Sequence, residues 1–349
     1  MKHLEDICID MTTTLSDAIK KLNEIGLKIL LVILEKQLVG VVTDGDIRRW
    51  ILKGGSLDCP ISEVMYRNPR VVIEEERDRA QALMLEQQLE AIPVIDSQGI
   101  PVDIIFLRDT IKGQAKTYNQ ISVPVVIMAG GKGTRLSPYT NVLPKPLIPI
   151  GSTTIVERII DSFYKNGCKD FWLTLNYKKN LIKAYFDDKD KPYQINYVEE
   201  EDYFGTCGSL SLLEQSLSHT LFVSNCDILL DIDYTDLYEF HIKNRNEMTV
   251  VTSLKSIQVP YGVFDLKNGS EIEKITEKPE YSFYVNTGIY VLEASVIKDI
   301  PRGCVFHMTD LLNKLLQQNR KVGAYPISDS SWQDMGEIEE MKKMIDSFR

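Results

Sequence analysis

Apolar positions in the first 112 residues follow a helical period and then a strand period, and this order occurs twice. In the first copy, Thr14 and Gly26 are typical helix-end residues. The helix predicted between them has one apolar face, formed by Leu15, Ala18, Ile19, Leu22 and Ile25. The apolar runs 29–34 and 38–42 then predict two strands, and a further helix is expected from Ile47.

The second copy repeats this order about sixty residues later. It contains a helical segment at 80–88, strands at 92–95 and 102–106, and a helix starting near Asp109. The match is one of pattern and not of identity. Coincidental similarity between two α/β hairpins is therefore the alternative to a true repeat.

A polar stretch without periodicity, residues 112–122, separates this region from the rest of the chain. We expect one domain at 1–115, a linker at 116–122 and a second domain at 123–349. Beyond the linker, apolar strand-like runs alternate with helical patterns, which predicts a Rossmann-like α/β domain with a mixed, mostly parallel sheet. The expected strands are 123–128, 171–175, 194–198 and 221–224, and the expected helices are 154–164, 179–186 and 209–217.

Charge and cysteine usage exclude several classes of partner. The formal net charge of the 349 residues is -10, which disfavours nucleic acid as a partner. The six cysteines include no CxxC pair and the first residues form no apolar signal core, so we expect reduced thiols and a cytoplasmic location. No apolar run approaches the 18 residues or so that a membrane span requires.

A glycine-rich loop follows the first strand of the second domain, and such a loop lets backbone N–H groups approach phosphate closely. Its residues are Ala129, Gly130, Gly131, Gly133, Thr134 and Arg135. The loop lacks the Gly-Lys-Ser/Thr ending of a Walker A motif, and on its own it fits a plain glycine-rich turn as well as a phosphate site. Shortly afterwards Pro144 and Pro146 flank Lys145 and fix the backbone around this ammonium group.

The loop and the Leu-Pro-Lys-Pro-Leu segment together resemble the signature of the sugar-1-phosphate nucleotidyltransferases, and the resemblance extends over residues 123–349. It implies that Arg135 and Lys145 hold phosphate and that Gly205 and Thr206 lie against the base. It also implies that Asp227 and Asp334 bind Mg²⁺. The chain departs from the family at Cys207, where alanine is usual, and at Cys226, where glycine is usual.

The same resemblance assigns the sugar-1-phosphate to segments further along the chain. It implies that Lys278, a catalytic residue together with Arg135, Lys145 and Asp227, meets the sugar phosphate. The implied sugar contacts are Gly262, Glu277, Lys278, Asn286 and Thr287. For each acidic residue in these sets, a helix cap or a turn is the structural alternative.

The N-terminal repeat resembles a tandem CBS pair, whose first copy carries the segment Gly-Val-Val-Thr-Asp-Gly-Asp at 40–46. The resemblance implies that Thr43 meets a nucleotide phosphate and Asp46 the ribose. In the second copy Phe106 replaces the hydroxyl residue while Asp109 keeps the acid, so one nucleotide site or none is expected.

The order of CBS pair and transferase resembles the glucosamine-1-phosphate guanylyltransferases of legionaminic acid synthesis. This implies transfer from GTP to glucosamine-1-phosphate in the formation of surface glycan precursors, by a homo-oligomer. The alternatives are a mannose- or glucose-1-phosphate nucleotidyltransferase using GTP, UTP or dTTP, and a non-catalytic sensor of nucleotides.

Overall fold

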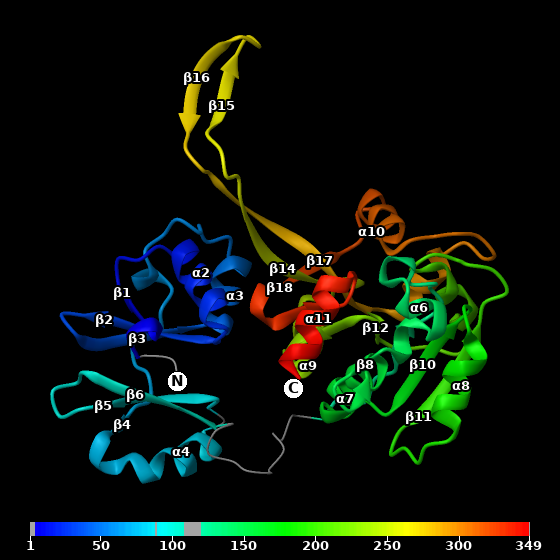
Figure 1. The fold of residues 1–349 in the computed structure, drawn as a ribbon, viewed down its shortest axis with the longest axis horizontal. Coiled ribbons are helices and arrows are strands. Elements are labelled where there is room, and N and C mark those ends of the chain that lie inside the picture. The colour runs from blue at the N-terminus through cyan, green and yellow to red at the C-terminus, as the bar shows by residue number, and fades with distance from the viewer. Residues whose placement is uncertain (1–3, 88, 108–119, 349) are drawn as a thin grey trace. The chain divides into compact units, whose positions relative to one another are not determined.

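The chain forms two compact units in the computed structural model, which describes residues 4–87, 89–107 and 120–348 (Figure 1). The described residues up to 107, with Ser328–Ser330, form the first unit, and the remaining described residues form the second. The helix expected near Asp109 and the start of the expected linker lie outside the described residues.

Each half of the first unit is built on a three-stranded sheet, and the two sheets have the same topology. In each, the first strand pairs in parallel with the second, and the second pairs antiparallel with the third. The repeat predicted from the pattern is confirmed, although the short first strand of each copy was missed. The strands are β1 (Cys8–Asp10), β2 (Ile29–Leu34), β3 (Gln37–Thr43), β4 (Val72–Ile73), β5 (Ala91–Ile95) and β6 (Pro101–Phe106).

One helix of this unit, α2, has the predicted ends. Thr14 accepts from the backbone N–H of Asp17, and Gly26 ends α2 with a φ of 59°. The start expected at Ile47 is wrong, because Thr43 caps α3 and the helix already begins at Asp44. The two copies also share apolar packing, because Ile104 of the second copy lies in one cluster with Leu31 and Val41 of the first. The helices are α1 (Leu4–Ile7), α2 (Leu15–Ile25), α3 (Asp44–Leu52) and α4 (Ala80–Glu86).

A seven-stranded sheet forms the centre of the second unit, in the order β11-β10-β7-β12-β17-β14-β18. The first four strands of this order are parallel, and β17 runs antiparallel to both of its neighbours. The predicted mixed, mostly parallel sheet is therefore confirmed. The strands are β7 (Val125–Met128), β10 (Asp170–Leu175), β11 (Gln194–Glu199), β12 (Leu221–Asn225), β14 (Met248–Gln258), β17 (Glu280–Leu292) and β18 (Val322–Ser328).

Alternation along the strands produces two apolar cores, one on each face of this sheet. In β7, Val125 and Ile127 lie in one core, whereas Val126 and Met128 lie in the other. The first core is covered by α7 (Ile155–Lys165), α8 (Lys179–Asp187), α9 (Tyr234–Asn244) and α11 (Ile338–Ser347). The second is covered by α10 (Met308–Gln317) and the 3-10 helices η5 (Gly208–Leu213) and η6 (Ala294–Asp299).

The α-helix expected at 209–217 is wrong, because the structure has only the 3-10 helix η5 at this place. The backbone N–H groups of Cys207 and Gly208 both donate to the carbonyl of Phe306, at 3.1 and 3.0 Å. The hydroxyl of Ser211 donates to the carbonyl of Gly208 at 2.7 Å and so competes with a regular α-helical bond. These contacts tie the segment to a distant loop.

A two-stranded ribbon extends from the ends of β14 and β17, away from the sheet of its own unit (Figure 1). It consists of β15 (Val263–Lys267) and β16 (Glu271–Thr276), which pair antiparallel with each other. Across the described residues, no helix combines the length and the apolar character needed to cross a bilayer.

Candidate active site

The glycine-rich loop starts where β7 ends at the carboxyl edge of the sheet. The backbone N–H of Ala129 still donates to the carbonyl of Thr174, at 3.0 Å. A Cβ atom at position 130 would lie 2.8 Å from Oε1 of Glu200, so any other residue there would displace this carboxylate. Gly133 has a φ of +64° and turns the chain into the 3-10 helix η3 (Thr134–Leu136), which carries Arg135.

Lys145 begins the 3-10 helix η4 (Lys145–Leu147), and its ammonium group forms an ion pair with the carboxylate of Asp227. Both residues are only 8% exposed. A buried charge without a partner is costly, so this contact explains how Lys145 and Asp227 are both accommodated. The short segment from Lys145 to Leu147 is buried as a whole, which fits the fixed direction predicted from the two prolines.

Asp227 lies two residues after the end of β12, the neighbour of β7. A short antiparallel strand pair, formed by segments distant in the sequence, brings Asp334 beside it. The strand β13 (Ile228–Leu230) pairs antiparallel with β19 (Trp332–Asp334), so that Ile228 lies opposite Asp334. In addition, the backbone N–H of Met335 donates to the carbonyl of Asp227 at 2.9 Å. Two carboxylates more than a hundred positions apart in the sequence therefore share one corner of a pocket.

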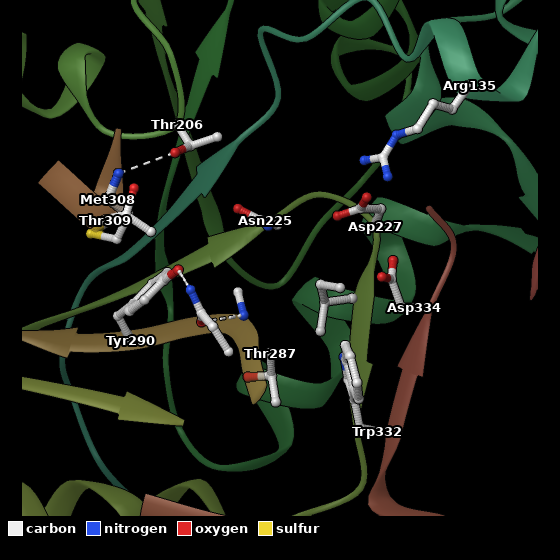
Figure 2. A pocket seen from close by; sticks show the side chains of 13 residues that line it. Arg135, Thr206, Asn225, Asp227, Thr287, Tyr290, Met308, Thr309, Trp332 and Asp334 are labelled. Carbon is white, nitrogen blue, oxygen red and sulfur yellow. Dashed lines mark hydrogen bonds between the residues drawn. The ribbon is translucent and has the colours of Figure 1, made fainter. Parts of the chain in front are cut away.

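Figure 2 shows this pocket, with the Arg135 guanidinium directed toward the carboxylate of Asp227 and with Asp334 beside them. Thr206 and the start of α10 lie at the other end, and Asn225 lies between the two ends. The pocket thus has a charged end and a polar, uncharged end. It is lined by Arg135, Thr206, Asn225, Asp227, Ile228, Asn286, Thr287, Gly288, Tyr290, Met308, Thr309, Trp332 and Asp334.

The environment of Asp334 suits a hard cation. Its Oδ1 atom is buried and has no hydrogen-bond partner within the described part of the chain. Burial, and then the negative charge of Asp227, raise the pKa of Asp334. Among the described residues there is no group of three metal-binding side chains, so Asp227 and Asp334 could hold Mg²⁺ only with further oxygen ligands from substrate or water.

Thr206, predicted to lie against the base, is held by the loop before α10. Its hydroxyl accepts from the backbone N–H of Met308 at 3.2 Å. Gly205 has a φ of +82°, and a Cβ atom there would lie 2.6 Å from the carbonyl oxygen of Phe306. These contacts hold Gly205 and Thr206 in place against the loop before α10. Thr206 lines the pocket.

Two of the predicted sugar contacts line the pocket and three do not. The side-chain amide of Asn286 donates to the Tyr290 hydroxyl at 2.7 Å, and Thr287 donates to the carbonyl of Val251 at 2.8 Å. Gly262, Glu277 and Lys278 lie at the base of the ribbon and outside the pocket lining. These three residues lie outside the pocket because β14 and β17 extend beyond the other strands of the sheet, and the three residues follow or precede the far ends of these two strands.

Several residues of the site were missed by the sequence reasoning. Tyr290, Met308 and Thr309 line the pocket but belong to segments without a recognisable motif. Asn225 ends β12 two residues before Asp227, and its position at the end of a central strand is a signal that could have found it. Glu200, in the acidic run 199–202, was not singled out either, yet it is only 3% exposed and lies against the glycine-rich loop.

In the first unit, the two predicted CBS ligand residues form a capping box at the start of α3. The Asp46 carboxylate accepts from the Thr43 hydroxyl at 2.6 Å and from the Thr43 backbone N–H at 2.9 Å. Arg49 donates to the other oxygen of Asp46 at 2.6 Å. Thr43 and Asp46 are adjacent as predicted, and this structure gives them a helix-capping role.

Comparisons with known proteins match both units. The family described as nucleotidyl transferase matches residues 124–347, and the CBS domain family matches residues 2–53. A mannose-1-phosphate guanyltransferase from Yarrowia lipolytica is 36% identical over 180 residues, which cover 49% of this chain and 50% of that protein. The bifunctional protein GlmU from Methanococcus aeolicus is 31% identical over 221 residues, 60% of this chain and 51% of that protein.

Solved structures show the same fold. HddC from Yersinia pseudotuberculosis superposes with a TM-score of 0.52 at 24% identity, covering 65% of this chain and 100% of that one. A putative glucose-1-phosphate thymidylyltransferase from Bacillus anthracis gives 0.53 at 22%, covering 66% and 96%. The chain spans about half the length of the curated relatives named above. With the family matching residues 124–347, well over half of the sequence, this chain belongs to the nucleotidyl transferase family and carries a CBS domain ahead of its transferase unit.

Proposed function

We propose that the second unit transfers a nucleotidyl group from an NTP to a sugar-1-phosphate, releasing pyrophosphate. The observation that carries this proposal is the meeting of Arg135, Asp227 and Asp334 at one end of the pocket, with Lys145 in an ion pair with Asp227. Two cations and two carboxylates placed so closely are suited to bringing two polyanions together. The polar end, with Thr206 and Asn225, offers hydrogen-bonding groups to the uncharged parts of the substrates.

The reaction needs positioning and charge more than proton transfer. An oxygen of the sugar phosphate, ionised at pH 7, attacks the α-phosphorus of the NTP, and the bond to the β-phosphate oxygen breaks. Arg135 and Lys145 hold the phosphates, so that the negative charge on the departing pyrophosphate is stabilised. No covalent nucleophile of the protein is required, and the cysteine nearest the site, Cys226, has a pKa raised to about 12 by burial.

Mg²⁺ fits this site, with Asp227 and Asp334 as its protein ligands. When bound, it would supply positive charge beside the α-phosphate. The buried, unpartnered Oδ1 of Asp334 supports this assignment. Lys145, which forms an ion pair with Asp227, also lies beside this site.

The guanyltransferase names of several relatives support the choice of GTP over pyrimidine nucleotides. The polar end of the pocket suits a base that both donates and accepts hydrogen bonds, because the side-chain amide of Asn225 can do both.

The sugar is proposed as glucosamine-1-phosphate, with mannose- and glucose-1-phosphate as alternatives. A panel of four NTPs against these three sugar phosphates, followed by pyrophosphate release, tests the reaction and both substrates. We expect GTP with glucosamine-1-phosphate to give the highest kcat/KM. Absence of pyrophosphate release with every pair would favour the non-catalytic sensor.

Replacing Lys278 by alanine should raise KM for the sugar phosphate by about tenfold and leave KM for the NTP unchanged. The reason is that the proposed contact involves only the sugar phosphate. Lys274→Ala, on the same ribbon, is the matched control. A rise in KM for the NTP would remove the segment at 277–279 from the sugar site.

For the first unit we propose a nucleotide ligand that Thr43 and Asp46 contact when it displaces their mutual capping bonds. Asp46→Ala in the full-length chain should abolish calorimetric binding of adenine or guanine nucleotides. Turnover without the nucleotide should stay unchanged. Wild-type protein that binds none of them at millimolar concentration would leave Asp46 as a helix cap alone.

A further inference from the structure

The ribbon formed by β15 and β16 has one strongly apolar face. Phe264 lies opposite Ile275, and Leu266 lies opposite Ile272. Residues directly opposite each other in an antiparallel pair share a face, and so do Phe264 and Leu266, which are two apart along one strand. The register shifts between the two pairs and leaves Glu273 without an opposite residue, so Ile272 and Ile275 share this face although they are three positions apart. Phe264, Leu266, Ile272 and Ile275 therefore form a single apolar face, and each is at least half exposed.

The opposite face of the ribbon carries charged side chains of both signs. Asp265 lies opposite Lys274, and Lys267 lies opposite Glu271. This alternation is typical of a strand pair with one face packed on a core and one face in water. The described residues nevertheless contain no second layer against the apolar face, and a two-stranded ribbon alone is at best marginally stable in water.

We propose that this apolar face is an interface with a second copy of the same chain, ribbon against ribbon about a two-fold axis. Identical apolar faces are complementary to each other, and a two-fold contact closes with two copies. Residues 263–276 contain three acidic and two basic side chains, so two ribbons approach almost without repulsion even though the chain has a net charge of -10. Because acidic and basic side chains are nearly equal in number, the ribbon has no charged patch that a strongly charged partner would bind.

The exposed apolar surface is large enough for such a contact. At the base of the ribbon, Ile257 lies opposite Tyr281, and Phe283 shares their face because it is two residues further along β17; all three are exposed by 44% or more. With about 200 Å² for each large side chain, these three residues and the four of the ribbon together expose on the order of 700 Å². A stable interface buries about 800 Å² per partner. The contact goes beyond the proposed reaction and does not depend on it.

Sedimentation velocity of the full-length chain tests the interface with two matched double variants. Phe264→Asn with Leu266→Asn changes the apolar face, and Asp265→Asn with Lys267→Asn places the same residue at neighbouring positions on the polar face. We expect the first variant to raise the dissociation constant of the dimer by about 100-fold or more, and the second to leave it within a few-fold. Equal association of both variants would overturn the proposal and favour dimerisation through the CBS pair or cover of the face by the same chain.

Oxidative cross-linking keeps the test decisive if the first variant folds poorly. Single cysteines are introduced at 264, 266, 272 and 275, in a chain whose accessible Cys8, Cys59 and Cys304 are replaced by serine. We expect a disulfide between two copies from at least one apolar position, since one position lies near the axis, and none from 265, 267, 271 or 274. Monomers at all four apolar positions, or dimers from both faces alike, would refute the two-fold contact.

Discussion

Asp227→Asn is expected to lower kcat at least about 100-fold at saturating Mg²⁺, because it removes one of two carboxylates proposed to hold the ion. The substitution keeps the size of the side chain. The strand β12 before it and the β13–β19 pairing after it should therefore stay intact. Steady-state pyrophosphate release with varied Mg²⁺ measures the loss.

Asp265→Asn is the control for this prediction, since it removes the same charge from the polar face of the ribbon. Circular dichroism and thermal unfolding show whether both variants keep the fold. Near-normal turnover of Asp227→Asn would exclude Asp227 from the site and leave Lys145 as the partner of a structural carboxylate.

Most central elements of the fold could be predicted from the period of the apolar residues. The strand Ile29–Leu34 and the helix Leu15–Ile25 have the bounds expected from sequence, because both bury an uninterrupted apolar run or face. Short strands such as β1 and β4 were missed. Two or three residues are too few to show a period, and their pairing depends on a partner strand distant in the sequence.

Site residues could be predicted where one short segment contains both a charged group and the glycine or proline residues that shape its backbone. Gly133, with its positive φ, and Lys145, between two prolines, are examples. Glu200 and the start of α10 were not predictable in this way. Glu200 is buried only because the phosphate loop and Phe204 pack against it, and neither contact is local in sequence.

Residue type alone also failed to separate two roles for the same side chain. Thr43 and Asp46 fit a nucleotide site by resemblance, and they equally fit a capping box by spacing. Gly262 and Glu277 fit a sugar site by resemblance, yet they lie in the short connections between the sheet strands and the ribbon and outside the pocket lining. In both cases the sequence does not determine whether these residues contact a ligand or the protein itself.

Lys145→Met is expected to lower kcat/KM about 1000-fold and also to destabilise the fold, because the same side chain holds phosphate and neutralises a buried carboxylate. Removing one partner of a buried pair costs about 3 kcal/mol or more, since Asp227 would remain charged and unpaired. Unfolding in urea measures the stability and pyrophosphate release measures the activity. Lys145→Arg should not restore activity, because the larger, forked guanidinium does not fit a site that is 8% exposed.

The double variant Lys145→Met with Asp227→Asn separates the two roles of the ion pair. It contains no unpaired charge at this place, so the free energy of unfolding should recover most of what Lys145→Met loses. Activity should stay at the level of the poorer single variant, because neither phosphate nor Mg²⁺ regains its ligand. Recovery of activity together with stability would mean that the pair acts only by holding the fold, and that Arg135 and Asp334 alone suffice for the reaction.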